Sequence, residues 1–516
     1  MECPETSLPE DTGATSCPFF PRRHFILVRL RNPVGPVRTL LRTVLILTLG
    51  LFTGLPQLAP GVHALACPQV SAFQFWRDWI ASSMEFSGDG SYLAFGSLYS
   101  SYGVSSNGTY AEHYNSTLTY FRRESGVPFW KASLGLGLRS PFPISMASNG
   151  SRIVAGYPTG GVQVFNAQTG TPIWSFVVHP HTSENGTSYI HRAISGDGRY
   201  VAMLVMSWFE NSNTLYLFNG DDGRIVWRYN FAPSIGNSTA GNPLALSDDG
   251  TRIAAIVGDS LFMFSNQDNR TLWSVKPLMD GFPQIGYSPP DGEDALSPRP
   301  NLLIDREGTF VVALGRQEIR VFSGTDGMLT TSIDLDETHE FPYADYEMSF
   351  SRDGSTISVD EGHKTTIRDR ASGSELFAVS DSSLSVDIRG VSGVSLSGDG
   401  KIVGMGTGSS GLIVFDRAGR RICDALVGPR NYLDATRVRV SEDGRYIAAS
   451  TSHDTTIIRI PSGIELLVPV LTNVVFWALI VAGVGSTLVL GLRGLLRKRK
   501  ARAGVDASRE LGIMRV

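Results

Sequence analysis

The sequence predicts an all-β fold, an eight-bladed β-propeller of four-stranded antiparallel blades, followed by one C-terminal transmembrane helix. Three observations support this. Gly is abundant, with 55 of 516 residues, as expected for many short strands joined by tight turns. A Ser-x-Asp-Gly turn followed by an apolar strand recurs at intervals of 44 to 60 residues. A charge-free stretch, residues 466–492, ends in a cluster of cations.

The recurring turn defines eight units. Each unit has a short strand, the Ser-x-Asp-Gly turn, an apolar strand, a strand similar to Val-x-Val-Phe, and a closing turn that often precedes Trp. One four-stranded sheet cannot bury both of its faces alone, so the units must stack, and radial stacking gives a propeller. The Gly of the first turn falls at Gly90, Gly150, Gly198, Gly250, Gly308, Gly354, Gly400 and Gly444.

The closing turn places Trp at one equivalent position in four units. In one of them Thr169-Gly170 precedes Trp174, and the other three carry Trp130, Trp227 and Trp273. This closing turn resembles the PQQ-like repeat of quinoprotein propellers, and the Ser-x-Asp-Gly half is similar to WD-type repeats. The resemblance covers residues 70–463. It implies the fold, whereas the activity of such propellers varies widely.

Ring closure is expected to involve the N-terminal part of the propeller. Blade eight has predicted strands at residues 438–441, 446–449 and 456–460, and then meets the apolar stretch. The segment Phe73-Gln74-Phe75-Trp76 precedes blade one and belongs to no blade of its own. We expect it to supply the fourth strand of blade eight. The alternative, a strand at residues 464–468, would consume the start of the transmembrane helix.

The cysteines indicate a disulfide at the junction where the ring closes. Of Cys3, Cys17, Cys67 and Cys423, only the last two remain after removal of a signal segment. Cys423 occupies the Trp position of blade seven, and Cys67 precedes the expected closing strand of blade eight. We therefore predict a disulfide between them, as suits an oxidising compartment. Ala64-Leu65-Ala66 before Cys67 also resembles a lipoprotein cleavage site, so lipidation is an alternative.

Both ends of the chain suggest a membrane. Residues 1–66 contain six Arg and then an apolar run, which predicts a signal segment that is cleaved or serves as an anchor. Residues 67–463 form the extracytoplasmic propeller, residues 466–492 the transmembrane helix, and residues 493–516 a basic tail. The positive-inside rule makes this tail cytoplasmic, so we predict a single-pass cell-membrane protein. Six Asn-x-Ser/Thr sequons agree with an outside propeller: Asn107, Asn115, Asn149, Asn185, Asn237 and Asn269.

Loop lengths predict which face binds a partner. The long segments, such as residues 97–116 and 277–300, all connect strands on one face of the propeller, whereas the Asp-Gly and Thr-Gly turns of the other face are short. Insertions on one face usually mark the working face, and Tyr and Trp suit protein or glycan contacts. Neutral surface loops are the alternative. The candidate binding residues are Tyr99, Tyr102, Tyr114, Trp208, Tyr287, Phe341 and Tyr343.

The sequence contains no clear motif for catalysis, cofactor binding or metal binding. An acidic body over residues 67–492 argues against nucleic acid as a partner. A quinoprotein-like enzyme is the alternative to a binding module, but no matching ligand set or vicinal Cys pair is present, so we expect no catalytic residues and no cofactor. A metal could bind at His179, His181, Glu184 and His191, but these histidines are better explained as solvated loop residues. Calcium could bind at the Asp-Gly turns, but their aspartates are better explained as caps of their own turns. We predict no metal site.

Overall fold

The computed structural model describes most of the propeller and part of the C-terminal region. The described residues are 65–74, 79–104, 110–136, 144–157, 160–178, 188–207, 212–232, 243–276, 302–314, 318–335, 347–360, 364–380, 391–407, 411–427, 437–451, 454–462, 483, 486–487 and 489–502. Residues 1–63 form a separate unit that lies outside this set.

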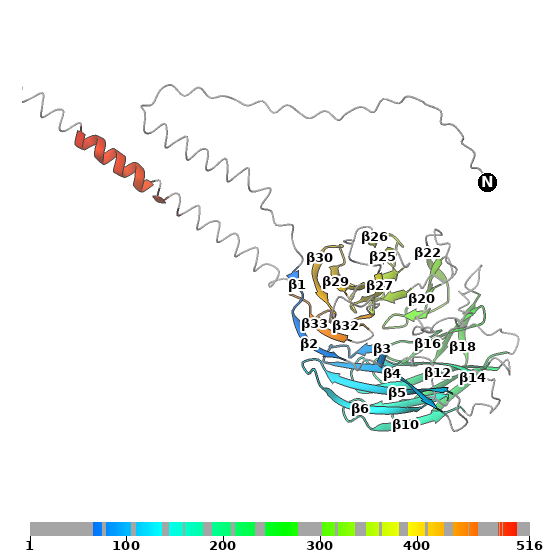
Figure 1. The fold of residues 1–516 in the computed structure, drawn as a ribbon. Coiled ribbons are helices and arrows are strands. Elements are labelled where there is room, and N and C mark those ends of the chain that lie inside the picture. Colours follow the sequence, from blue (N-terminus) through cyan, green and yellow to red (C-terminus); the bar gives the residue numbers. More distant parts are fainter. Residues whose placement is uncertain are drawn as a thin grey trace, which may run out of the picture. The chain divides into compact units, whose positions relative to one another are not determined.

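Eight antiparallel sheets follow one another around a ring (Figure 1), which confirms the predicted all-β fold of eight four-stranded blades. The first strands of neighbouring blades contact each other all the way round, so these strands line the axis. Blades one to four consist of β3 (Trp79–Phe86), β4 (Tyr92–Val104), β5 (Tyr110–Arg122) and β6 (Pro128–Leu136); β7 (Ser145–Met146), β8 (Arg152–Tyr157), β9 (Gly161–Asn166) and β10 (Pro172–Val177); β11 (Ser188–Ile194), β12 (Tyr200–Ser207), β13 (Ser212–Asn219) and β14 (Ile225–Asn230); and β15 (Leu244–Leu246), β16 (Arg252–Val257), β17 (Ser260–Ser265) and β18 (Thr271–Val275).

The second half of the ring repeats this pattern until its last blade. Blades five to seven consist of β19 (Leu302–Ile304), β20 (Phe310–Leu314), β21 (Glu318–Ser323) and β22 (Leu329–Asp334); β23 (Glu347–Phe350), β24 (Thr356–Asp360), β25 (Lys364–Asp369) and β26 (Glu375–Ser380); and β27 (Val391–Leu396), β28 (Ile402–Thr407), β29 (Gly411–Asp416) and β30 (Arg421–Leu426). Blade eight combines β31 (Arg437–Val440), β32 (Tyr446–Ser450) and β33 (Asp454–Arg459) with β2 (Gln69–Gln74).

The N-terminal strand closes the ring, as predicted. β2 pairs antiparallel with β33, from Gln69 opposite Ile458 to Gln74 opposite Asp454. The strand begins at Gln69, four residues before the predicted start at Phe73, and has a bulge between Gln69 and Ser71, whereas Phe75 and Trp76 lie outside the described residues. The Arg459 N–H donates to the Pro68 carbonyl at 2.8 Å, so the chain enters and leaves the ring at neighbouring points.

A disulfide joins Cys67 to Cys423, with the two Cα atoms 5.1 Å apart, and this confirms the predicted bridge. Both sulfur-bearing side chains are buried, and the bond engages the sulfur that lipidation would need. Just before it, β1 (Leu65–Ala66) pairs in parallel with the outer edge of β30, and the Cys67 N–H donates to the Asp424 carbonyl at 2.9 Å. Blade seven thereby gains a fifth strand, and blade eight gains its fourth from the same segment.

In five of the eight blades, a side chain at one position of the outermost strand donates a hydrogen bond to the next blade. The indole N–H of Trp130, Trp174 and Trp273 donates to a carbonyl in the closing turn of the following blade, at 2.7, 2.9 and 3.0 Å. Thr331 and Ser71 occupy the same register in blades five and eight, and their hydroxyls donate to the Arg370 and Arg123 carbonyls. Cys423 occupies it in blade seven. Thr331 and Ser71 thus make the contact to the next blade in blades five and eight, where the sequence has no Trp at this position.

Apolar side chains fill the spaces between blades. One cluster joins Leu204 and Leu217 of blade three to Ile253 and Phe264 of blade four, all of them buried. The closing junction is packed in the same way, because Cys67, Cys423 and Val414 share a cluster with Ile447 and Ile458 of blade eight. Burial between sheets, rather than within one sheet, explains why the blades are stable only as a stacked ring.

The C-terminal described residues 489–502 are helical and exposed. No helix formed by the residues that the structure describes is both long enough and apolar enough to cross a membrane. Most of the predicted transmembrane helix, residues 466–482 together with 484, 485 and 488, lies outside those residues, as do residues 1–64 of the predicted signal segment and the alternative strand at residues 464–468. Leu65 and Ala66, the last two residues of that segment, form β1.

Removing the disulfide should destabilise the propeller strongly. The bridge closes a loop with a sequence separation of 356 residues, and bridges over long loops typically contribute about 2–5 kcal/mol. We expect Cys67→Ala, Cys423→Ala and the double variant to lower the melting temperature of the full-length protein by similar amounts. Equal melting of the double variant and the wild-type protein, both without reductant, would show that the bridge does not support ring closure.

Candidate functional site

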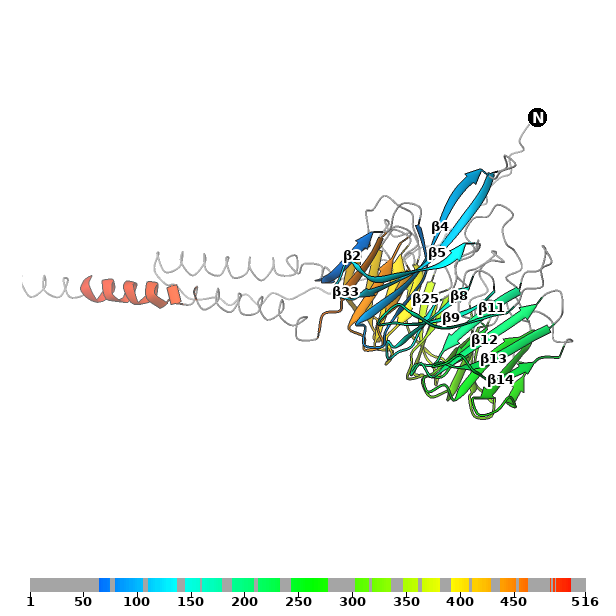
Figure 2. The same cartoon turned by 90° about the horizontal axis from the view of Figure 1, so that it is seen from below.

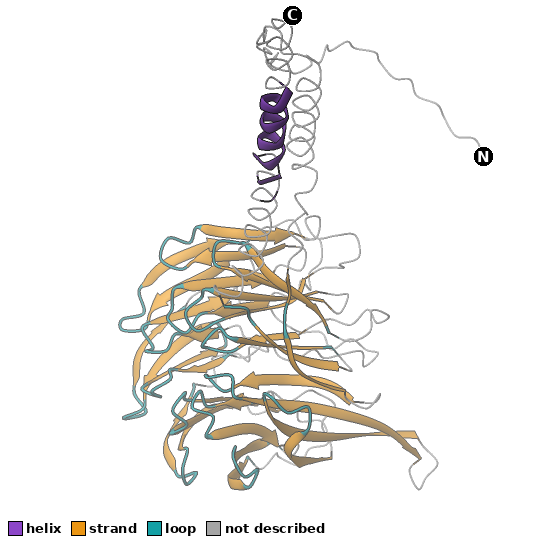
Figure 3. Cartoon of the chain, turned by 90° about the vertical axis from the view of Figure 1, so that its left-hand side faces the viewer, coloured by secondary structure: helices purple, strands orange, loops and turns teal. Residues whose placement is uncertain are grey.

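The two faces of the propeller differ in construction. The described turns, which join first to second and third to fourth strands, gather on one side of the strands (Figure 3). We call this side the turn face and the opposite side the loop face. The candidate loop-face residues Trp208, Tyr287, Phe341 and Tyr343 lie outside the described residues, as do the sequons Asn107, Asn185 and Asn237.

The longest described feature of the loop face is a two-stranded arm. Of residues 97–116, predicted as a loop, residues 97–104 and 110–116 instead continue β4 and β5, which pair from Tyr92 opposite Arg122 to Val104 opposite Tyr110. This corrects the sequence interpretation: Tyr99, Tyr102 and Tyr114 belong to strands, and Asn115 pairs within β5. Tyr99, Tyr102, Val104, Tyr110 and Tyr114 are of residue types that favour strands, and this was the signal that loop length obscured. Figure 2 shows β4 and β5 projecting beyond the neighbouring strands.

The arm extends past the rest of its sheet. The β3–β4 pairing ends at Trp79 opposite Tyr99, and the β5–β6 pairing ends at Asn115 opposite Leu136. Residues 100–104 and 110–114 pair only with each other among the described strands. In blade three, by contrast, β11 reaches Ser188 opposite Ser207, level with the end of the β12–β13 pairing. The arm is therefore a particular feature of blade one.

On the turn face, the first turn of each blade joins a closed circle of backbone hydrogen bonds. At every one of the eight junctions, an N–H of one turn donates to the carbonyl of the second turn residue in the next blade. The accepting residues are Ser148, Gly196, Asp248, Arg306, Arg352, Gly398, Glu442 and Gly88, and the distances run from 2.7 to 3.2 Å. These carbonyls therefore point around the ring, toward neighbouring turns.

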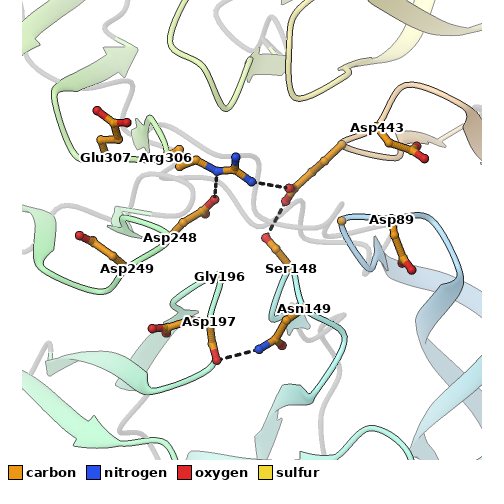
Figure 4. Close-up of a pocket in the computed structure, with 12 residues that line it drawn as sticks. Asp89, Ser148, Asn149, Gly196, Asp197, Asp248, Asp249, Arg306, Glu307 and Asp443 are labelled. Atoms are coloured by element: carbon orange, nitrogen blue, oxygen red, sulfur yellow. Dashed lines mark hydrogen bonds and ion pairs between the residues drawn. The ribbon is translucent and has the colours of Figure 1, made fainter.

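The residues whose carbonyls accept these bonds include four with charged side chains, and these side chains meet across the axis of the propeller. Arg306 and Arg352 contact Asp248 at 2.9 and 2.8 Å and Glu442 at 3.5 and 3.4 Å. Ser148 donates to Glu442 at 2.6 Å (Figure 4). This ion cluster ties blades four, five and six to blade eight. It borders a recess of about 750 Å³ whose rim carries further carboxylates of the turns, including Asp89, Asp197 and Asp443.

The turn aspartates cap their own turns. The Ser247 hydroxyl donates to Asp249 Oδ1 at 2.7 Å, and the Thr251 N–H donates to the same oxygen at 2.9 Å. Burial acts to raise the pKa of Asp249, but these hydrogen bonds outweigh it and hold the pKa below its usual value. The described residues contain no group of three His, Cys, Asp or Glu side chains that could hold a metal ion.

Blade five departs from this pattern. Asp305 replaces the usual Ser and accepts the Phe310 N–H at 2.9 Å, and Glu307 replaces the usual Asp. Burial raises the pKa of Asp305, and the backbone hydrogen bonds do not fully compensate. Nearer the axis, burial likewise raises the pKa of Glu85, although Arg439 lies 3.6 Å away.

His191 is not a solvated loop residue. It lies in β11 and is only 7% exposed, and its burial, together with the charge of Arg192, lowers its pKa to about 3. The neighbouring Arg192 donates to the Gly161 carbonyl of blade two at 2.7 Å. His179, His181 and Glu184, the other members of the candidate metal site, lie outside the described residues.

Two of the three described sequons lie on the turn face. Asn149 holds the aspartate place in blade two, where its Nδ2 donates to the Asp197 carbonyl at 2.9 Å and its Oδ1 accepts the Ser151 N–H. Asn269 holds the Gly place in a closing turn, and its Nδ2 donates to the Arg228 carbonyl at 3.1 Å. Both side chains therefore have a structural part in their turns, and glycosylation at the six sequons stays a prediction.

Sequence comparison supports the repeat. Residues 74–230 and 158–278 match the PQQ-repeat family model described as outer membrane protein assembly factor BamB. The first four blades thus carry PQQ-type propeller repeats. The match spans less than half of the chain, and no curated protein sequence matches it.

Solved structures share the fold. The C-terminal WD40 domain of Sif2 is 13% identical with a TM-score of 0.50, and the alignment covers 77% of this chain and 99% of that domain. BamB from Moraxella catarrhalis is 15% identical over 76% of this chain and 100% of its own, with a TM-score of 0.45. The computationally designed Ika8 protein is 14% identical with a TM-score of 0.49, over 76% of this chain and 100% of its own. At these identities the likeness is one of fold alone.

Two isosteric variants should show opposite pH dependences. The ionised form of Asp249 is favoured in the fold, so its stabilisation is present above the unfolded pKa near 3.8 and is lost as the pH falls through the lower folded value. Asp249→Asn should therefore melt about 1–3 °C below the wild-type protein at pH 7, with the difference closing on acidification.

Asp305 has a raised pKa, so its ionisation costs stability as the pH rises. Asp305→Asn should melt above the wild-type protein at pH 7. Shifts of the same sign in both variants would contradict this assignment.

Proposed function

We propose that this protein is a membrane-anchored, extracytoplasmic binding module that holds a protein or glycan partner at the loop face of its propeller. The observation that carries the proposal is the arm of β4 and β5, which extends beyond the blade where no other described pair of strands does so. Residues 100–104 and 110–114 pair only with each other among the described strands, and such an extension offers surface to a partner.

The turn face is less suited to the same task. Its carbonyls are engaged in the backbone circle, and its central charges are paired across the axis. Its aspartates accept hydrogen bonds from their own turns, as Asp249 does from Ser247. A partner on this face would have to compete with those contacts. The PQQ-repeat match supports a binding role by analogy, because the matching family model bears the name of a protein assembly factor.

The proposed location rests on three features. The Cys67–Cys423 disulfide suits an oxidising compartment. The charge-free residues 466–492 precede six Lys or Arg within residues 493–502, as in a transmembrane helix with a cytoplasmic tail. The chain leaves the ring after β33 on the turn face, beside the Pro68 carbonyl. An anchored propeller would therefore turn its loop face away from the bilayer.

Protease protection tests this location. Protease added to intact cells should remove the propeller from the full-length protein and leave a fragment that carries an epitope tag placed after Val516. Detergent lysis before digestion should remove the tag as well. Protection of the propeller in intact cells, with cleavage of the tag only after lysis, would contradict an extracytoplasmic propeller.

Site-specific cross-linking tests the binding face. A photo-reactive amino acid replaces Tyr102 on the arm of the full-length protein in its native membrane, and the matched control carries it at the exposed Asp222 on the turn face. We expect the arm position to yield a defined cross-linked product that the control lacks. The product identifies the partner by mass spectrometry.

Removing the arm gives an independent measure. Residues 101–113 are replaced by Asn-Gly, which closes the paired Ser100 and Tyr114 with a two-residue turn and keeps the pairing with β3 and β6. Because the blade stays intact, the melting temperature should change little, while co-purification of the cross-linked partner from solubilised membranes should fall at least about tenfold, a loss of about 1.4 kcal/mol in binding free energy. Unchanged co-purification would contradict the proposed binding face.

A further inference from the structure

The closing turn of blade one carries an exposed surface that is both apolar and basic. Val127 is 70% exposed and Phe129 is 43% exposed, and the guanidinium carbon of Arg122 lies 4.3 Å from the centre of the Phe129 ring. Lys131, which follows in β6, is exposed as well. We call these four residues the rim patch. Apolar side chains combined with cations are typical of surfaces that bind at the interface of a lipid bilayer.

The charge of this turn sets it apart from the corresponding turn across the ring. Residues 121–131 contain three Lys or Arg against one acid, whereas the corresponding residues 322–332 of blade five contain one acid and no Lys or Arg. Met328 of blade five holds the place of Val127 and is 67% exposed. Blades one and five lie opposite each other in an eight-bladed ring, so the two turns form a matched pair for comparison.

The rim patch lies beside the point where the chain leaves the ring. The Ser71 hydroxyl of blade eight donates to the Arg123 carbonyl at 2.7 Å. The Arg123 guanidinium carbon also lies 3.9 Å from the centre of the Tyr446 ring. Tyr446 pairs with Arg459, the last residue of β33. The closing turn of blade one and the exit of the chain are therefore neighbours on the turn face.

Little chain separates this exit from the charge-free stretch. Ser462 is described, and only residues 463–465 precede the start of the stretch at residue 466. At about 3.5 Å per residue, this connection spans at most about 14 Å. A transmembrane helix that begins there would hold blades one and eight close to the bilayer. Such a tether makes a contact with the bilayer intramolecular, so that even a weak surface affinity keeps it formed.

The rest of the turn face favours contact at one edge over contact across the whole face. The recess at the centre of this face is lined by carboxylates of the first turns, including Asp89, Asp197 and Asp443. Anionic lipid headgroups repel carboxylates and attract Lys and Arg. The basic rim patch is therefore the part of the turn face whose charge complements an anionic membrane surface.

We propose that the rim patch rests on the bilayer that anchors the protein, with Val127 and Phe129 in the interfacial layer and Arg122 and Lys131 at anionic headgroups. This inference rests on the proposed function and adds an orientation to it. The propeller then leans toward blade one, with its axis inclined to the membrane normal. Because the arm belongs to the same blade, this contact also sets the height above the membrane at which the arm is presented.

Cross-linking to lipid tests the contact. The full-length protein carries a photo-reactive amino acid in place of Val127 and is reconstituted in vesicles of phosphatidylcholine with about 30% phosphatidylglycerol, an anionic lipid. The matched control carries it in place of Met328. We expect mass spectrometry to find at least about fivefold more lipid adduct at residue 127 than at residue 328. A protein adduct in place of the lipid adduct at residue 127 would overturn the proposal.

Two double variants test the cations of the patch. Arg122→Gln with Lys131→Gln should lower the lipid adduct at residue 127 at least about threefold, because the attraction to anionic headgroups is lost. Arg270→Gln with Lys276→Gln removes the same charge from blade four, where the two side chains are 88% and 80% exposed, and should leave the adduct within about twofold of its original level. Equal losses in the two double variants would overturn the role of the patch and indicate an effect of net charge alone.

Alkaline carbonate extraction separates failure of this inference from failure of the proposed function. A full-length protein that stays in the vesicles during extraction but gives equal lipid adducts at residues 127 and 328 would overturn the blade-one contact and leave the anchor intact. Release of the protein from the vesicles would contradict the proposed membrane anchoring itself. We expect retention in the vesicles together with the excess of lipid adduct at residue 127.

Discussion

Closure of the ring is the constraint on which the rest of this structure depends. Each blade buries its apolar faces only against its neighbours, so an open ring would expose two sheet faces at once. The chain closes the gap with β2, which arrives from the far end of the sequence to pair with β33. The Cys67–Cys423 bond and the β1–β30 pairing attach that segment to blade seven as well. The closing segment therefore contacts both blades at the junction.

Ring closure is reinforced along the axis and along the rim. Near the axis, the circle of backbone hydrogen bonds passes through all eight turns, and the ion cluster joins blade eight to blades four, five and six. At the rim, Trp130, Trp174 and Trp273 bond to the next blade, and Thr331 and Ser71 do the same with hydroxyls. These contacts engage many of the polar groups of the turn face.

The arm is an extension of one blade that keeps the common pairing of the ring. β4 and β5 keep the common pairing with β3 and β6 as far as Tyr99 and Asn115, and only the residues beyond them are additional. The described apolar clusters at the junctions with blades two and eight contain none of the added residues. An insertion at this point therefore leaves the core unchanged, which is the reason that propellers tolerate varied loops on a constant scaffold.

The sequence by itself determined the number of blades, the closing role of the N-terminal segment and the Cys67–Cys423 pair. Each follows from a local repeat: Gly at a fixed turn position, Trp or its substitute at a fixed strand position, and one strand left without a blade. Only the tertiary structure decided that Asp248, Arg306, Arg352 and Glu442 meet, because residues of the variable turn position come together through the circular arrangement of the blades. It also decided that residues 97–104 and 110–116 form strands and that His191 is buried. Strand length past the edge of a sheet, and burial between blades, depend on neighbours distant in the sequence, which no local pattern records.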